Sequence, residues 1–181
     1  PFANDAKFDW DKFSEVTIKT QRLMDDMIDL ELEQIDKIID KIESDPEPSH
    51  VKAIELDMWN NVKSQAINGR RTGLGITGLG DMLASLGITY GSKESIEITE
   101  KVYAGLATNA YKSSCILAKE RGSFPVYDHS LESDHPFLGR IWEKDPEILE
   151  LSKKFGRRNI AITTTAPAGS VSVLTQTTSG I

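Results

Sequence analysis

The feature that most constrains the fold is the long stretch 10–43, which contains neither glycine nor proline. Apolar side chains recur along it every three or four residues, which is the spacing of an amphipathic helix. These side chains are Phe13, Val16, Leu23, Met24, Met27, Ile28, Leu32, Ile35, Ile38, Ile39 and Ile42. Asp9 is placed to cap this helix, because a carboxylate there accepts hydrogen bonds from free backbone amides. The run is longer than most globular helices, so a break near Leu30–Glu33 is an alternative.

Prolines and glycines divide the rest of the chain. Pro46 and Pro48 end the first helix, because proline lacks an amide hydrogen and restricts the residue before it. A second helix is expected over 51–68, just before Gly69. Its apolar face is expected to consist of Ile54, Met58, Val62 and Ala66.

A third helix is expected from Lys93 to Arg121, with Ser92 as its cap and Gly122 as its end. Its apolar face is expected to consist of Ile98, Val102, Leu106, Ala110 and Ile116. After it, residues 123–139 contain two prolines and a glycine and are expected to form a loop. A short helix is expected over 146–155.

Two segments have the composition of short buried strands. One is 73–77 in the glycine-rich region, and the other is 158–165, which is rich in isoleucine and threonine. A short helical piece is expected over 81–86. Long helices combined with a few buried strands predict an α/β fold.

The acidic balance and the single cysteine limit the classes of function. The chain of 181 residues carries a net charge of −7 at pH 7, which disfavours nucleic-acid binding because that requires a basic face. No apolar run approaches the roughly 18 residues of a membrane span, and no secretory signal is present. Cys115 is the only cysteine, which excludes an internal disulfide framework. A location in a reducing compartment, the cytoplasm, is expected.

Residues 166–172, Ala-Pro-Ala-Gly-Ser-Val-Ser, are the best candidate for a binding site. A strand that opens through small residues into a helix exposes backbone amides, and these amides form an anion site together with the helix dipole and two hydroxyls. The alternative is an ordinary strand-to-helix turn capped by Ser170. The residues alone favour this alternative, because such turns are common. The segment lacks the Gly-Lys-Ser/Thr ending of a Walker loop.

The glycine-rich segment 73–80 matches the dinucleotide-binding pattern G-x-G-x-x-G at Gly73, Gly75 and Gly78. The segment follows a helix rather than a long strand, and no acidic residue ends a second strand about 20 residues later. Close packing of two backbones is therefore the preferred explanation for these glycines.

Few other side chains are candidates for metal binding or reaction. The histidines and the acidic residues near two of them are His50, His129, His135, Asp128, Glu132 and Asp134. Their spacing matches no known ligand pattern, so no metal site is expected. Cys115 is expected to be a buried or half-buried hydrophobe, because nothing in the sequence indicates a lowered pKa for its thiol. Arg70 and Arg71 are expected to be solvated or paired with carboxylates, with anion binding as the alternative.

Three segments together resemble the large subunits of ribonucleotide reductases, and they occur in the order found in that family. The first is 70–83, which contains Arg-Arg-Thr-Gly-Leu-Gly, and the second is 118–125, Ala-Lys-Glu-Arg-Gly-Ser-Phe-Pro. The third and closest runs from 158–161 through 166–172 to 177–181, Thr-Thr-Ser-Gly-Ile. Its style is most similar to the adenosylcobalamin-dependent class, with a metal-cofactor class I enzyme as the alternative.

The resemblance implies that residues 1–181 are one portion of a ten-stranded α/β barrel that is incomplete in this chain. The helical part is 1–69, and 70–181 holds the glycine-rich segment, the long helix and the loop. It also implies that the loop binds the phosphates of a ribonucleotide, which reverses the preference for an ordinary turn. The residues given this role are Pro167, Ala168, Gly169, Ser170, Val171 and Ser172.

The implied activity is the reduction of ribonucleoside diphosphates to deoxyribonucleotides by thiyl-radical chemistry. In the family two thiols supply two electrons and a third cysteine forms the radical, so a single cysteine is insufficient. The family's Asn-x-Cys-x-Glu segment does not occur here. No residue is therefore given a catalytic role, and this segment alone is expected to be inactive. Pro1 is not an initiator Met and Ile181 lies within a loop-like run, so an internal piece of a longer chain is expected.

The implied partners are a ribonucleotide substrate, the remainder of the reductase chain and, for the whole enzyme, a second copy of itself. Adenosylcobalamin is the implied cofactor of the whole enzyme, and this segment alone is not expected to bind it. Two alternatives stay open: a free-standing, non-enzymatic helical module that binds a nucleotide or a protein, and a structural segment without a ligand.

Overall fold

The computed structural model of this chain describes residues 5–180. Residues 1–4 and Ile181, on which part of the expectation of an internal piece depends, lie outside the described residues. The helices are α1 (Trp10–Ser44), α2 (Ser49–Gly69), α3 (Leu79–Ser85), α4 (Lys93–Arg121), α5 (Pro136–Lys144), α6 (Pro146–Phe155) and α7 (Gly169–Thr175), with a 3-10 turn at His129–Leu131. Within the described range, none of these helices has the length and apolar character needed to span a bilayer.

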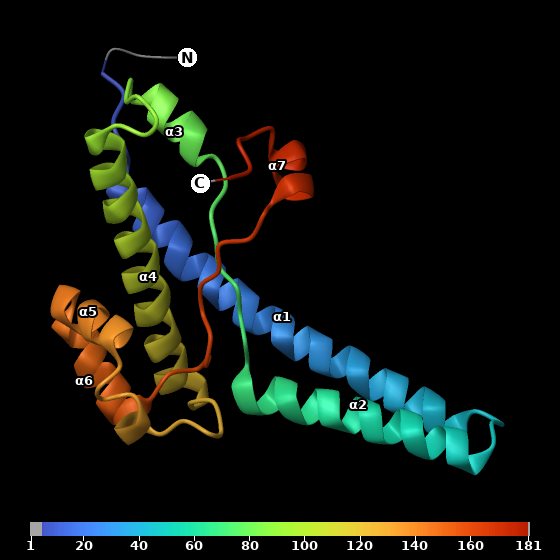
Figure 1. Cartoon of the computed structure of the whole chain (residues 1–181). Coiled ribbons are helices and arrows are strands. Elements are labelled where there is room, and N and C mark those ends of the chain that lie inside the picture. Colours follow the sequence, from blue (N-terminus) through green and yellow to red (C-terminus); the bar gives the residue numbers. More distant parts are fainter. Residues whose placement is uncertain (1–4, 181) are drawn as a thin grey trace.

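Helix α1 is continuous, so the alternative of a break near Leu30–Glu33 is wrong. The Asp9 carboxylate caps it as expected, since Oδ1 accepts the amide N–H of Lys12 at 2.9 Å. Helix α1 packs against α4 near its start and then continues outward beside α2 (Figure 1). We call the projecting hairpin, residues 29–69, the arm.

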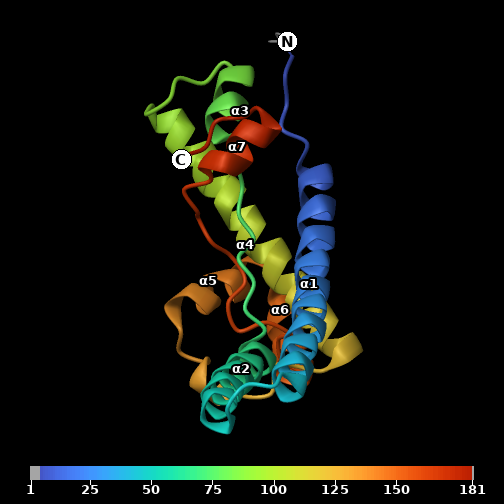
Figure 2. The same cartoon turned by 90° about the vertical axis from the view of Figure 1, so that its right-hand side faces the viewer.

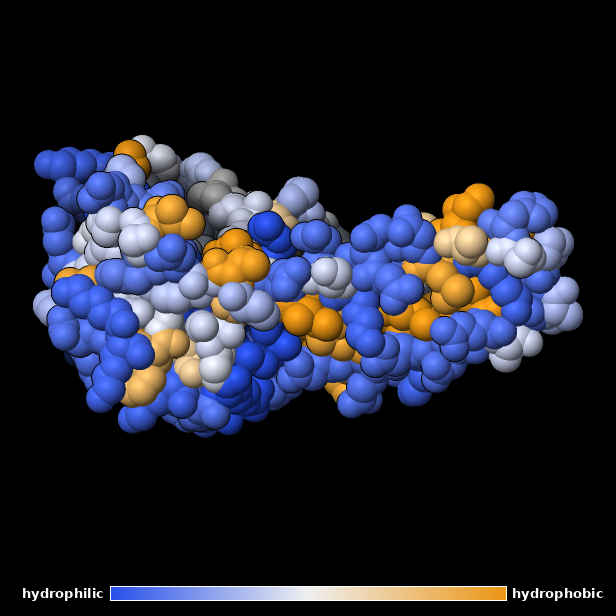
Figure 3. Space-filling view, turned by 90° about the horizontal axis from the view of Figure 1, so that it is seen from below, coloured by the Kyte–Doolittle hydropathy of each residue, from blue (hydrophilic) through white to orange (hydrophobic). Residues whose placement is uncertain are grey.

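The apolar face expected on α2 exists, but most of it is not buried. Ile54, Met58 and Val62 expose 70%, 50% and 41% of their surface. Helix α2 packs along α1, and one neighbouring helix covers only part of a helical surface. Apolar surface is accordingly visible along the arm (Figure 3).

The core forms around α4, whose limits and caps match the expectation. The Oγ atom of Ser92 accepts the amide N–H of Ser95 at 3.1 Å, and Gly122 ends the helix with a φ of +86°. The buried side chains of this core are Leu74, Leu106, Ala110, Tyr111, Cys115, Leu138, Ile141, Ile148 and Ile162. They come from α4, α5, α6 and the two extended segments. Helix α5 was expected to be loop; Pro136 instead occupies its first turn, where a missing amide hydrogen costs little.

The two expected strands are extended segments that pair with each other in parallel. Their backbone hydrogen bonds are Thr72 N–H to Ala161 O (2.9 Å), Leu74 N–H to Ile162 O (2.8 Å) and Thr164 N–H to Leu74 O (2.9 Å). The pairing is recorded as an isolated bridge between Leu74 and Thr163, and no β-strand occurs in residues 5–180. The expectation of strands at 73–77 and 158–165 is therefore wrong here, because each segment has only the other as a neighbour and two paired segments alone make a marginal sheet.

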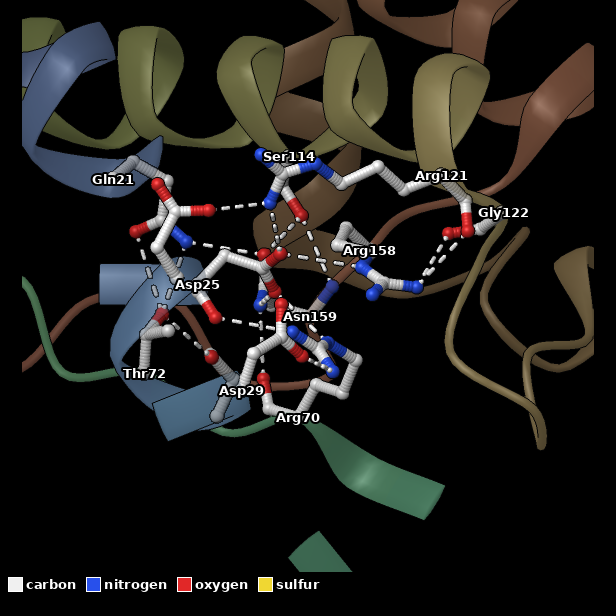
Figure 4. Close-up of polar contacts among 12 residues, drawn as sticks. Gln21, Asp25, Asp29, Arg70, Thr72, Ser114, Arg121, Gly122, Arg158 and Asn159 are labelled. Atoms are coloured by element: carbon white, nitrogen blue, oxygen red, sulfur yellow. Dashed lines mark hydrogen bonds and ion pairs between the residues drawn. The ribbon is translucent and has the colours of Figure 1, made fainter. Parts of the chain in front are cut away.

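A buried carboxylate on α1 joins these segments to the helices (Figure 4). Asp25 is fully buried, and its Oδ1 accepts hydrogen bonds from Arg70 Nε and Asn159 Nδ2, each at 2.9 Å. Its Oδ2 lies 3.2 Å from Arg158 Nε and 3.3 Å from Arg121 Nη1. We call these five residues the Asp25 cluster. The pairing of Arg70 with a carboxylate confirms one of the two expectations for the Arg70–Arg71 pair, whereas Arg71 is exposed.

Neutral side chains complete the hydrogen bonding around this cluster. Gln21 Nε2 donates to Asn159 Oδ1 and to Thr72 Oγ1, both at 3.1 Å. Ser114 Oγ donates to Asn159 Oδ1 at 2.9 Å and accepts the Asn159 amide N–H at 3.1 Å. No buried side-chain nitrogen or oxygen in the described part of the chain lacks a partner. The starts of both extended segments are thus fixed to α1 and α4.

The cluster also sets the protonation of Asp25. Burial by itself would raise the pKa of this carboxyl, but hydrogen bonds and charge from Arg70, with Asn159 and Arg158, hold the pKa below its ordinary value of 3.8. Asp25 therefore contributes stability that is present above pH 3.8 and is lost as the pH falls through its lower folded-state pKa.

Replacing Gly75 with alanine should destabilise the fold. A Cβ at this position would lie 2.6 Å from the carbonyl oxygen of Thr164, so the two extended segments would have to separate. We expect a loss of about 1–3 kcal/mol in the free energy of unfolding, measured with urea. Gly105→Ala on α4 is the control: its Cβ would meet Phe13 at an ordinary 3.7 Å, and removing a helical glycine should add about 0.5–1 kcal/mol. Equal stabilities for both variants would contradict the close approach.

The Asp25→Asn variant should lose about 3–5 kcal/mol at pH 7, because the buried Arg70 loses its buried charge partner and keeps only the half-exposed Asp29. The difference from the wild type should shrink as the pH falls from 3.8 through the lower folded-state pKa of Asp25, where the wild-type carboxylate becomes protonated. Urea unfolding between pH 7 and pH 3 measures this difference, with the exposed Asp57→Asn as the matched control. A difference that stays constant with pH would show that the charge of Asp25 is not the cause.

Candidate functional site

The segment expected to bind an anion follows the extended segment 158–165 directly. We call residues 166–172, which lead into α7, the α7 turn. Helix α7 lies beside α3 in both perpendicular views (Figures 1 and 2). The α7 turn is thus placed at the end of the paired extended segments that lies away from the Asp25 cluster.

The structure leaves most of the expected binding residues accessible. Ala168 is half-buried and Ser172 is buried. The exposed members of the set are Pro167, Gly169, Ser170 and Val171. The Ser172 hydroxyl donates to the carbonyl oxygen of Gly169 at 2.7 Å, so it supports the turn from within. Ser170, rather than Ser172, presents its hydroxyl outward.

The first turn of α7 has the properties of an uncapped helix start. Ala168 occupies the N-cap position, and no side chain of the described residues caps the helix there. The Ser170 cap proposed for an ordinary turn is therefore wrong, because Ser170 lies inside the helix. The Gly169 amide donates to the carbonyl oxygen of Pro167 at 2.8 Å, and the Ser172 amide donates to that of Ala168 at 2.9 Å. The first-turn amides left for an anion are therefore those of Ser170 and Val171, which precede the first residue with an i−4 acceptor in the helix. Nothing lies within 4 Å of a Cβ built on Gly169, so the turn can be approached closely there.

An open pocket of about 510 Å³ lies next to the α7 turn. Its lining residues are Gly80, Tyr90, Ser172, Thr177, Thr178, Ser179 and Gly180. Hydroxyl groups and glycine backbone dominate this lining, and it includes no lysine or arginine. An anion here would therefore be held by neutral donors. Tyr90, Thr177 and Thr178 were not among the predicted binding residues. Only the two threonines had a signal in the sequence, because they belong to the third segment that resembles the reductase family.

The glycine-rich segment packs against the residues that precede and follow the α7 turn. Cβ atoms on Gly73 and Gly75 would meet Thr164 at 3.1 Å and 2.6 Å, and one on Gly80 would meet Thr178 at 3.2 Å. These close approaches confirm that packing of two backbones explains the glycines. The dinucleotide pattern has no preceding strand within the described residues, so the structure gives that reading no support.

The acidic and histidine side chains near residues 128–135 have structural contacts. Glu132 forms an ion pair with the buried Arg157. His129 Nδ1 lies 3.1 Å from the Tyr127 hydroxyl, and His135 Nδ1 accepts the first-turn amide of α5 at 3.3 Å. Glu132, His129 and His135 thus each have a partner within the protein.

Three carboxylates on α1 lie close enough together to bind a metal ion, and they were not predicted as a site from the sequence. Oxygen atoms of Asp25, Asp26 and Asp29 lie within 4.8 Å of one another. Arg70 contacts Asp25 and Asp29, and Arg121 contacts Asp25 and Asp26. The two arginines therefore already balance the charge of the three carboxylates. We interpret this group as an ion-pair cluster.

Cys115 is completely buried on α4, as expected for a structural hydrophobe. Burial raises the pKa of its thiol to about 12. The thiolate is the reactive form of cysteine, so this side chain is protonated and inert at neutral pH.

Comparison with known proteins agrees with the resemblance seen in the sequence. Residues 2–181 match the family described as ribonucleotide reductase, barrel domain. A vitamin B12-dependent ribonucleoside-diphosphate reductase of Mycobacterium tuberculosis is 29% identical over 98% of this chain and 19% of its own length. The protein of the same name from Thermoplasma acidophilum is 30% identical over 97% of this chain and 17% of its own length. Ribonucleoside-diphosphate reductase subunit alpha of Helicobacter pylori is 31% identical over 71% of this chain and 18% of its own length.

The chain thus spans about a fifth of the length of these curated relatives. The match covers the glycine-rich segment, α4 and the α7 turn together, and the relatives include vitamin B12-dependent and other reductase large subunits. Because this match covers residues 2–181, the chain belongs to the ribonucleotide reductase barrel-domain family.

Proposed function

We propose that this chain is part of the catalytic subunit of a ribonucleotide reductase and that its α7 turn holds the phosphates of the ribonucleotide. The observation that carries the proposal is the uncapped first turn of α7, with Gly169 open to approach and Ser170 exposed. Backbone amides and a hydroxyl are suitable donors to phosphate oxygens. The residues assigned to this role are Pro167, Ala168, Gly169, Ser170, Val171 and Ser172.

The reaction places further requirements that this chain does not meet by itself. Replacing a ribose 2′-hydroxyl with hydrogen consumes two electrons, which two thiols supply when they form a disulfide. Cys115 is alone, buried and protonated, so it does not take this role. We therefore assign the thiyl-radical chemistry to cysteines elsewhere in the full-length protein and binding to this segment, which we expect to be inactive alone. The relatives are named as ribonucleoside-diphosphate reductases, and we propose the same substrate class here.

For the whole enzyme we propose adenosylcobalamin as the cofactor, because two of the relatives are named as vitamin B12-dependent. Its chemistry would be to generate the radical, and a metal-cofactor subunit is the alternative source. We assign none of the described residues to this group. From the family resemblance we also propose that the whole enzyme is a homodimer in the cytoplasm.

The paired extended segments support a place for this chain within a ten-stranded α/β barrel. They run in parallel and are connected through α4, as neighbouring strands of an α/β barrel are connected through a helix. We propose that further segments of the full-length protein extend this pair into a sheet. Residues 1–181 would then form one part of the barrel, with 1–69 helical and 70–181 carrying the site.

The exposed apolar side chains of α2 favour one alternative, a non-enzymatic module that binds a partner protein through the arm. The full-length sequence decides between the two. A reductase must contain the Asn-x-Cys-x-Glu segment and a pair of redox-active cysteines, whereas a binding module needs neither.

Replacing Gly169 with valine should strongly weaken phosphate binding while leaving the fold intact. The space around its Cβ is open, so the new side chain would displace a ligand rather than a neighbouring residue. Titration with inorganic pyrophosphate, followed through the amide chemical shifts of 169–172, should show binding by the wild type. We expect the affinity of the variant to be at least about tenfold weaker, as loss of one or two charge-assisted hydrogen bonds implies.

Gly139→Val provides the matched control, because a Cβ on this glycine of α5 also meets nothing within 4 Å. It should bind pyrophosphate as the wild type does. A phosphate site at the α7 turn would be contradicted if the amide chemical shifts of 169–172 in the wild type did not change. It would also be contradicted if the two valine variants and the wild type had equal affinities.

A further inference from the structure

The chain that leaves α7 is fixed to the start of α3 mainly by one residue, Thr178. Its carbonyl oxygen accepts the amide N–H of Gly78 at 2.8 Å, and its own amide donates to Asp81 Oδ2 at 2.7 Å. Its hydroxyl accepts the amide N–H of Asp81 at 3.4 Å. The backbone and side-chain polar groups of Thr178 are therefore all directed at the first turn of α3.

This arrangement resembles a helix capping box whose partner comes from a distant part of the chain. An acidic residue at the third position of a helix ordinarily bonds to the N-cap amide of the same helix. Asp81 holds that position in α3, but its carboxylate binds Thr178, which is 97 residues away in sequence, and the N-cap amide of Gly78 also turns to Thr178. Thr178 thus supplies the acceptors for the amides of Gly78 and Asp81 at this helix start.

Glycines make this close docking possible. A Cβ on Gly80 would lie 3.2 Å from both Cγ2 and Oγ1 of Thr178, and a Cβ on Gly78 would lie 3.5 Å from Thr177. The Thr177 hydroxyl also donates to Thr77 Oγ1 at 3.2 Å. Any larger residue at position 80 would push the segment 177–178 away from α3.

The α7 turn is therefore held at two points by one continuous segment. Leu74 and Gly75 contact Thr164 before the turn, and Asp81 contacts Thr178 after it. Thr178 also lines the pocket beside the turn. We infer that Asp81 is a positioning residue, which fixes the far end of the phosphate-binding turn through Thr178. This inference rests on the proposed function of that turn.

The charge of Asp81 allows a test in which two explanations predict opposite signs. A carboxylate near a bound phosphate repels it, so removal of the charge alone should strengthen phosphate binding. If Asp81 acts by position, loss of its hydrogen bond to Thr178 should weaken binding. Asp81→Asn separates the two effects, because the amide oxygen still accepts the Thr178 N–H while the charge is absent.

The experiment is a titration of the chain and its variants with inorganic pyrophosphate. Binding is measured by calorimetry and by the amide chemical shifts of residues 169–172. We expect Asp81→Ala to bind about tenfold more weakly than the wild type, as the loss of one charge-assisted hydrogen bond implies. Asp81→Asn should bind as tightly as the wild type or more tightly. Asp57→Ala on the exposed surface of α2 removes the same charge and should leave the affinity unchanged.

A second variant keeps the test valid if Asp81→Ala does not fold. Gly80→Val leaves the Asp81 carboxylate in place but fills the space next to Thr178, and it should also weaken pyrophosphate binding. In the full-length reductase, both variants should raise KM for the ribonucleotide more than they lower kcat, whereas general destabilisation would lower the amount of active enzyme and leave KM unchanged.

The outcomes separate the two proposals. If the wild type binds pyrophosphate and Gly169→Val does not, but Asp81→Ala and Gly80→Val bind as tightly as the wild type, only the positioning role is overturned. If Asp81→Asn binds pyrophosphate as weakly as Asp81→Ala, the side-chain oxygen that asparagine retains is not sufficient, and the positioning role is again overturned. If the wild type itself does not bind, the proposed phosphate site fails and the positioning role fails with it.

Discussion

The buried carboxylate of Asp25 is the contact on which the other parts of this structure depend. It lies on α1 and accepts hydrogen bonds from Arg70 and Asn159, the residues at which the two extended segments begin. Removing a carboxylate and a guanidinium from water is expensive, so such a pair adds little net stability compared with apolar packing. The positions of the two groups are strictly constrained, however, because any other arrangement would leave a buried charge without a partner. The cluster therefore acts mainly on specificity: it aligns the two segments in one register.

That register is transmitted along the glycine-rich segment to the α7 turn. From Arg70 onward, backbone hydrogen bonds and small residues keep the segment in contact with its parallel partner as far as Thr164. The contact is regained at Thr178, beyond α7. The α7 turn itself has few contacts of its own and an open surface at Gly169. Rigid support on both sides with an open middle suits a site that must present backbone amides in a fixed arrangement to a ligand.

The sequence was most informative where structure is local. Helices α1 and α4 follow from apolar periodicity and from the caps at Asp9 and Ser92, because these depend on neighbouring residues. Helix α5 was missed, since Pro136 reads equally well as the start of a helix or as part of a loop. The Asp25 cluster had no sequence signal, because an aspartate in an acidic helix normally faces water and its arginine partners lie 45 to 133 residues away. The α7 turn was identified through its family resemblance, since its small residues alone favoured an ordinary turn.

The distribution of charge resolves an apparent conflict between an acidic chain and an anion site. The arm, residues 29–69, contains 10 acidic and 4 basic side chains, so it carries −6 of the net charge of −7. Residues 70–181 contain 12 acidic and 13 basic side chains and are nearly neutral. The arm points away from α7 (Figure 1), and exposed charges are screened over about 8 Å at physiological salt. A phosphate at the α7 turn would therefore experience the local amides and hydroxyls rather than the net charge, and those neutral donors would orient the nucleotide without the strong attraction of a lysine or arginine site.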